Sequence, residues 1–125
     1  MNFVERFRSD FDQEMKSTRP MIERVPGDRV EWRPHAKSFP LGHLTQLVAR
    51  MPSWIGNMTT KPQIDLAETP AYSFDTPESM LREFDEGVRE ATTSLMALKE
   101  SRLDDTWSLV AGGQLVTDDR GNFGI

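Results

Sequence analysis

Three segments of the chain carry apolar residues at alternating spacings of three and four, which place side chains on one face of a helix. In the segment 39–59 this spacing connects Leu41, Leu44, Val48, Met51, Ile55 and Met58. Ser38 is a favourable N-cap, and Pro40 is tolerated in a first turn because its missing N–H would have no partner there. We therefore predict a helix over 39–59 that buries this stripe against other helices, with a kink at Pro52.

A second stripe predicts a helix over 3–25. Asn2 can cap this helix, and one face carries Val4, Phe7, Phe11, Ile22 and Val25. The middle of that face is polar, because Glu14 and Thr18 stand where the spacing requires apolar side chains. Two interpretations follow. Either Glu14 and Thr18 line a polar pocket or the edge of a cleft, or Met15 fills the seam and Glu14 is solvated.

The third stripe predicts a helix over 77–101, with Thr76 as N-cap and Pro77 at the first helical position. Gly87 lowers the helix propensity of this segment, so we expect it to mark a close helix contact. The connection 60–75 has neither a helical nor an alternating pattern. It is long enough to cross between two parallel helices, which is the interpretation we favour over a lid on a cleft.

The pattern changes after residue 104, where apolar and polar residues begin to alternate. Gly112 and Gly113 permit the positive φ angles of a tight turn, which predicts a β-hairpin over 107–117. The expected fold is therefore an all-α bundle with a small hairpin, forming one domain over 1–125. A fourth helix is missing from this pattern, and the chain could be a truncation of a longer protein.

Composition narrows the classes of function. The chain has no cysteine, which excludes disulfides, thiolate metal ligands and a cysteine nucleophile, and fits a reducing compartment. Its net charge of -5 is spread along the sequence without a basic cluster, so we expect no nucleic-acid partner. No signal peptide and no run of membrane-spanning length is found, which predicts a soluble cytoplasmic protein without a membrane partner.

The run WRPHAKSFPLGHLTQLVARMPSW, from Trp32 to Trp54, resembles the DinB-like family of helical putative metalloenzymes, as do the long loop and the WSLVAGGQL segment. The resemblance covers residues 3–117. It implies an up-down four-helix bundle with a long crossover, often dimeric, and a divalent nickel or zinc ion held by three histidines. It also implies a metal-dependent transferase or isomerase that uses a small-molecule thiol, or a hydrolase.

The metal ligands of the family cannot all be assigned to residues of this chain. The first ligand lies in a pattern like LGxLxxHxA, and here LGHLTQLVA places Leu47 at that position. The other two ligands come from a fourth helix. His43, one turn before Leu47, is either a surface histidine or a weak candidate for a metal ligand. His35 either orders its loop or contacts a ligand, and Trp32 and Trp54 are expected in the core or in the wall of a cleft.

Three hypotheses for function remain open. The first is a DinB-like metal-dependent thiol transferase or hydrolase represented without its last helix. The second is a non-catalytic bundle that serves as a binding or dimerisation module, which Leu47 favours. The third is a metal-independent enzyme that uses Glu14, Thr18 or His43. Because three apolar stripes without a fourth helix leave a seam exposed, we also expect a homodimer.

Overall fold

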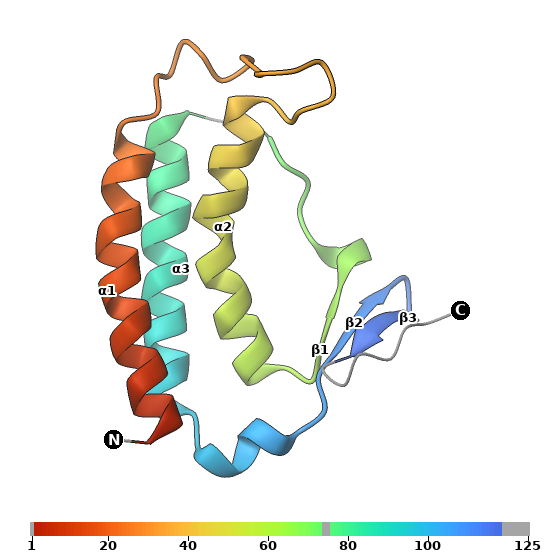
Figure 1. Cartoon of the computed structure of the whole chain (residues 1–125). Helices are drawn as coiled ribbons and strands as arrows, with labels where there is room; N and C mark the ends of the chain where they lie inside the picture. The colour runs from red at the N-terminus through yellow and green to blue at the C-terminus, as the bar shows by residue number, and fades with distance from the viewer. Residues whose placement is uncertain (1, 74–75, 119–125) are drawn as a thin grey trace.

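The computed structural model describes residues 2–73 and 76–118, and the described chain is mostly helical with one small sheet (Figure 1). Its elements, in order, are α1 (Phe3–Glu23), α2 (Leu41–Thr60), β1 (Gln63–Asp65), the 3-10 helix η1 (Leu66–Glu68), α3 (Pro77–Ala97), the 3-10 helix η2 (Glu100–Asp104), β2 (Ser108–Ala111) and β3 (Gln114–Asp118). The three predicted long helices are confirmed, with ends that differ by up to four residues.

Helix α3 is the centre of the bundle, because it packs against both α1 and α2. Figure 1 shows that α2 and α3 run in the same direction and that α1 runs opposite to both. The chain between α2 and α3 returns along the side of the bundle. This confirms that the segment 60–75 contains a crossover between parallel helices.

Side chains from all three helices form the core. One cluster joins Ile22 of α1, Ala49 of α2, and Met80 and Phe84 of α3. A second cluster joins Phe11 of α1 to α3, and Met15 packs against both clusters.

Two of the three predicted N-caps are confirmed, because Asn2 accepts a hydrogen bond from the Glu5 N–H and Thr76 accepts one from the Ser79 N–H.

The predicted start of the second helix is wrong. Ser38 is not its N-cap; Pro40 holds that position in an extended conformation, and its side chain makes no capping hydrogen bond. The preceding loop supplies the missing acceptors instead. The N–H of Leu41 donates to the Trp32 carbonyl at 2.7 Å, and the N–H of Gly42 donates to the Val30 carbonyl at 2.8 Å. The loop thus caps α2 with its backbone.

The third helix ends at Ala97, four residues before the predicted end at 101. Leu98 is extended, and the chain then turns through η2 beneath the start of α1. There the carboxylate of Glu100 accepts a hydrogen bond of 2.7 Å from the Val4 N–H. The Val4 N–H lies in the first turn of α1 and has no partner within the helix. Glu100, in the segment that follows α3, therefore caps α1.

The predicted hairpin over 107–117 is confirmed as β2 and β3, joined at Gly112 (φ 60°) and Gly113 (φ 86°). The expected all-α fold with one hairpin missed β1, which pairs in parallel with β2 and makes a three-stranded sheet. Asp65 joins these parts, because its carboxylate accepts hydrogen bonds from the N–H groups of Ala67 and Gly112. These backbone hydrogen bonds lower the pKa of Asp65.

The expectation that α2 buries its large apolar stripe is wrong. Four members of that stripe are exposed to solvent, between 39% and 47%: Leu44, Val48, Met51 and Met58. We call the six residues of the stripe the α2 seam: Leu41, Leu44, Val48, Met51, Ile55 and Met58. The helix buries a different face, on which Gly42, Ala49 and Gly56 recur every seven residues. Small residues let two helices approach closely, which is why this face lies on α3.

The same close contact explains Gly87 of α3. A Cβ atom at Gly87 would stand 3.1 Å from the backbone nitrogen of Ser53 and 3.5 Å from Cβ of Pro52. This confirms the predicted close helix contact.

Among the described residues, no helix is both long and apolar enough to cross a membrane.

Two glycine substitutions test this contact. Gly87→Ala should destabilise the fold, because overpacking against the α2 backbone costs roughly 1–3 kcal/mol, while the gain in helix propensity is at most about 1 kcal/mol. Gly56→Ala is the matched control. Its Cβ would meet atoms of α3 at 3.7 Å or more, so it should stabilise the protein by about 0.5–1 kcal/mol. Urea denaturation measures both, and equal stabilisation by the two changes would contradict the contact.

Candidate functional site

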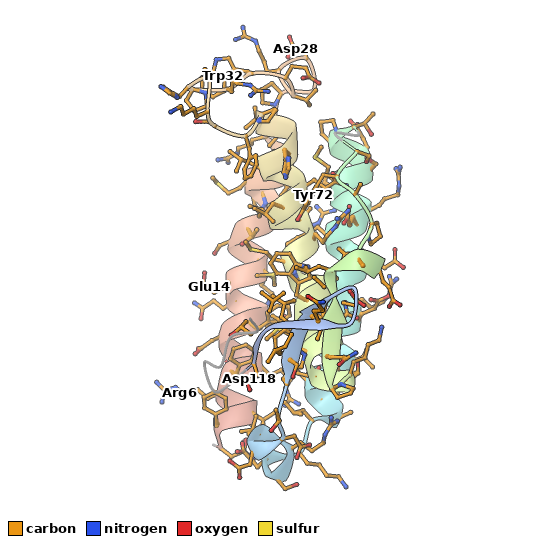
Figure 2. All side chains as sticks on the ribbon, turned by 90° about the vertical axis from the view of Figure 1, so that its right-hand side faces the viewer. Arg6, Glu14, Asp28, Trp32, Tyr72 and Asp118 are labelled. Carbon is orange, nitrogen blue, oxygen red and sulfur yellow. The ribbon has the colours of Figure 1, made fainter. Side chains whose placement is uncertain are left out.

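Glu14 and Thr18, the polar candidates on α1, do not form a pocket with other side chains. Glu14 is exposed, and Figure 2 shows its side chain pointing away from α2 and α3. Thr18 is half-buried, and its hydroxyl donates to the Glu14 carbonyl of the same helix at 2.9 Å. Met15 fills the seam between the core clusters. Of the two sequence interpretations, the structure therefore agrees with the one in which Met15 fills the seam and Glu14 is solvated.

The two histidines occupy different environments. His35 lies in the loop before α2, where its Nδ1 accepts a hydrogen bond of 3.1 Å from the Lys37 N–H. This bond orders the loop, as one of the two sequence interpretations expected. His43 is half-buried on α2 between two rings, stacked on Phe39 at 4.3 Å and on Tyr72 of the crossover at 4.3 Å. The histidine therefore attaches the crossover to α2.

Leu47 is half-buried, one turn after His43 on α2. Its side chain is aliphatic and has no lone pair for a metal. In the described parts of the chain, no three His, Cys, Asp or Glu residues stand close enough together to hold a metal ion. The residues present around Leu47 therefore do not fit the three-histidine site that the DinB resemblance implies.

A polar cluster that the sequence interpretation missed lies between α2, α3 and the crossover. Arg50 is at its centre, with only 9% of its side chain exposed. Its Nε donates to Glu83 of α3 at 2.8 Å, and its Nη1 donates to the Pro70 carbonyl at 2.7 Å. The guanidinium also lies over the ring of Tyr72, 4.4 Å from the centroid. One cation thus binds a helix, a backbone carbonyl and an aromatic face.

Gln46 completes this cluster one turn earlier on α2. It is 4% exposed, its amide nitrogen donates to Glu83 at 3.3 Å, and its amide oxygen accepts from the Ser73 N–H at 2.9 Å. The sequence carried one signal for this arrangement. Gln46 and Arg50 are four residues apart on a helix with no other arginine, lysine or carboxylate, so the two can act on one face.

A cleft of about 380 Å³ opens beside this cluster, between α2, α3 and the crossover. Trp54 forms part of its wall, as expected, whereas Trp32 is 52% exposed in the loop before α2 (Figure 2). The expectation that Trp32 lies in the core or in the wall of a cleft is therefore wrong. Glu86 and Glu90 line the cleft from α3, and Lys61 lines it from the end of α2. Trp54 is the only sequence-predicted site residue that lines this cleft; Glu14, Thr18, Trp32, His35, His43 and Leu47 do not.

An apolar surface lies elsewhere, on the flanks of α1 and α2. Phe3 and Phe7 of α1 are 62% and 40% exposed, and they line one cavity with Ile55 and Met58 of the α2 seam. A small, mostly apolar cavity of about 190 Å³ lies between α1, α2, the end of α3 and η2, lined by Phe3, Val4, Phe7, Ile55, Met58, Thr59, Leu95, Leu98 and Leu103. We call this surface the α1/α2 groove: Phe3, Phe7 and the α2 seam, with the cavity at its Met58 end.

Comparisons with models of protein families, with curated proteins and with solved structures gave no match.

Replacing Arg50 tests the polar cluster. Arg50→Ala leaves Glu83 without its cation and frees the Pro70 carbonyl, so we expect a loss of about 2–4 kcal/mol in the free energy of unfolding. The amide hydrogen of Ser73 should also exchange faster with deuterium, since the crossover loses its anchor. Arg82→Ala, at an exposed position of α3, should cost less than about 0.5 kcal/mol. Equal effects of the two changes would contradict the assigned role.

Proposed function

We propose that this chain is a non-catalytic dimerisation module with a DinB-like helical bundle, and that a second copy covers its α1/α2 groove. The observation that carries the proposal is the exposure of the α2 seam. An apolar stripe of six residues on one helix is normally buried in a globular protein. Here four of its members stand in solvent between 39% and 47% exposed, beside the exposed Phe3 and Phe7.

The size of the groove is suitable for a weak dimer. Helix α2 has 20 residues, so it is about 30 Å long, and one helix is roughly 10 Å wide. The α2 seam therefore offers about 300 Å² per copy, to which Phe3 and Phe7 of α1 add at one end; this is below the roughly 800 Å² per partner of a standard interface and fits a weak, concentration-dependent dimer. Contiguous apolar surface of this extent on a soluble chain marks an interaction site.

The enzymatic alternative has less support from the residues. A thiol transferase or hydrolase of the DinB-like class would need a divalent nickel or zinc ion, and the position of its first ligand is held by Leu47. The nearest imidazole on the same helix, His43, is stacked between Phe39 and Tyr72. The polar groups of Arg50 and Gln46 are engaged with Glu83 and the crossover. A structural role accounts for these contacts.

Sedimentation equilibrium tests the proposed dimer. Met51→Glu places a carboxylate in the middle of the α2 seam of each copy, so dimerisation buries two like charges at a cost of about 3 kcal/mol, or about a hundredfold in Kd. Met96→Glu is the matched control, because Met96 is 66% exposed on α3, outside the groove. It should leave Kd unchanged. A monomeric parent chain, or equal weakening by both changes, would contradict the proposal.

Metal content tests the enzymatic alternative. The purified, untagged chain offered nickel or zinc should retain no stoichiometric ion after dialysis, as measured by elemental mass spectrometry, because Leu47 cannot act as a ligand. One ion per chain that is lost in His43→Ala would show a rebuilt site. That result would favour the metal-dependent enzyme over the non-catalytic dimerisation module.

A further inference from the structure

We infer that the interface between two copies is an antiparallel pair of α2 helices, related by a two-fold axis that passes between Val48 and Met51. This inference rests on the proposed dimerisation and adds the face, the direction and the register of the contact. Two faces of α2 have different partners. The small residues of one face are used against α3, whereas the α2 seam is left to a partner.

The spacing of the α2 seam is typical of a helix that pairs with another helix. Its six residues follow one another at three, four, three, four and three positions, which is a strict heptad seam. Such a seam is narrower than the apolar face of an ordinary bundle helix and fits knobs-into-holes packing against one partner helix.

The same spacing is also self-complementary in the antiparallel direction, because it reads identically from either end. A two-fold axis midway between Val48 and Met51 therefore aligns every member of the seam with a member of the second copy. Val48 meets Met51, Leu44 meets Ile55, and Leu41 meets Met58. No apolar position of the seam is left opposite a polar one.

Charge does not oppose this pairing. Two-fold symmetry brings the α2 surfaces of both copies together, so an unpaired charge there would be repelled by its counterpart. The only residues of α2 that can carry a charge are His43 and Arg50. Neither belongs to the seam, and both contact Tyr72 on the crossover side of the helix. The seam itself is uncharged, as self-association requires.

The apolar cavity decides the direction. It lies at the Ile55 and Met58 end of the groove, where Phe7 of α1 lines it as well. In an antiparallel pair, the exposed Leu44 of the second copy arrives opposite Ile55 and can fill the cavity. In a parallel pair Ile55 would meet Ile55, the cavity of each copy would face that of the other, and both Leu44 side chains would lie at the opposite end.

Disulfide trapping tests the direction and the register, and the chain suits it because it has no cysteine. Leu44→Cys and Ile55→Cys are prepared separately, one of them isotopically labelled, and oxidised alone and as a mixture. An antiparallel pair holds two copies of Cys at 44 about 16 Å apart along the helix, beyond disulfide reach, whereas 44 and 55 are opposite. The mixture should give at least about tenfold more linked dimer than either variant alone.

Two further experiments keep the result interpretable. Leu41→Cys mixed with Met58→Cys is a second pair that leaves the half-buried Ile55 side chain in place, and each of these positions lies about 25 Å along the helix from its own copy. Met96→Cys, outside the groove, should give no linked dimer. Circular dichroism and sedimentation of the reduced variants report folding and the dimer.

Each outcome has a distinct meaning. Linkage in the mixtures alone supports the antiparallel seam. Linkage of Leu44→Cys to itself would overturn it in favour of a parallel pair. A dimer that sediments as such but links in no combination would overturn the proposed seam while leaving dimerisation intact. A monomer in sedimentation would overturn both.

Discussion

The structure depends on the close packing of α2 against α3. Gly42, Ala49 and Gly56 form a small-residue face on α2, and a Cβ at Gly87 of α3 would stand only 3.1 Å from the backbone nitrogen of Ser53. This contact fixes the rotation of α2 about its own axis. Every other property of the helix follows from that rotation, because a helix that turns one face to its neighbour must turn the opposite face away.

The rotation gives α2 three separate surfaces. The small residues lie on α3; Gln46 and Arg50 reach Glu83 and the crossover; and the α2 seam remains in solvent. A buried cation with a carboxylate, a carbonyl and an aromatic ring as partners gives specificity to the packing as well as binding energy. The polar cluster therefore holds the crossover in place and also prevents α2 from turning its apolar seam inward.

Much of this fold could be predicted from the pattern of residues. The three helices, the caps at Asn2 and Thr76, the crossover and the hairpin at Gly112 and Gly113 all depend on local chemistry that a sequence displays directly. The parallel strand β1 could not be predicted in this way. It has three residues and pairs with a strand more than forty positions away, so it leaves no local periodicity in the sequence. The buried face of α2 was predicted wrongly because hydrophobicity alone favours burial of the larger side chains, whereas the close approach of α3 favours the smaller ones. The polar cluster was missed for a related reason, because Gln46 and Arg50 lie on α2 outside the apolar stripe that was expected to face the bundle.

The central claim, that the α2 seam is exposed in one chain and covered by a second, can be measured directly at the methionines. Met51 and Met58 belong to the seam, Met21 and Met96 are exposed outside it at 66% each, and Met80 is buried at 1%. With ¹³C-labelled methionine methyl groups and a soluble paramagnetic agent, NMR reports the accessibility of each one as the protein is diluted. The account predicts that Met51 and Met58 are protected at high concentration and become accessible on dilution, while Met21 and Met96 stay accessible and Met80 stays protected. Relaxation of Met51 and Met58 as strong as that of Met21 at every concentration would contradict it.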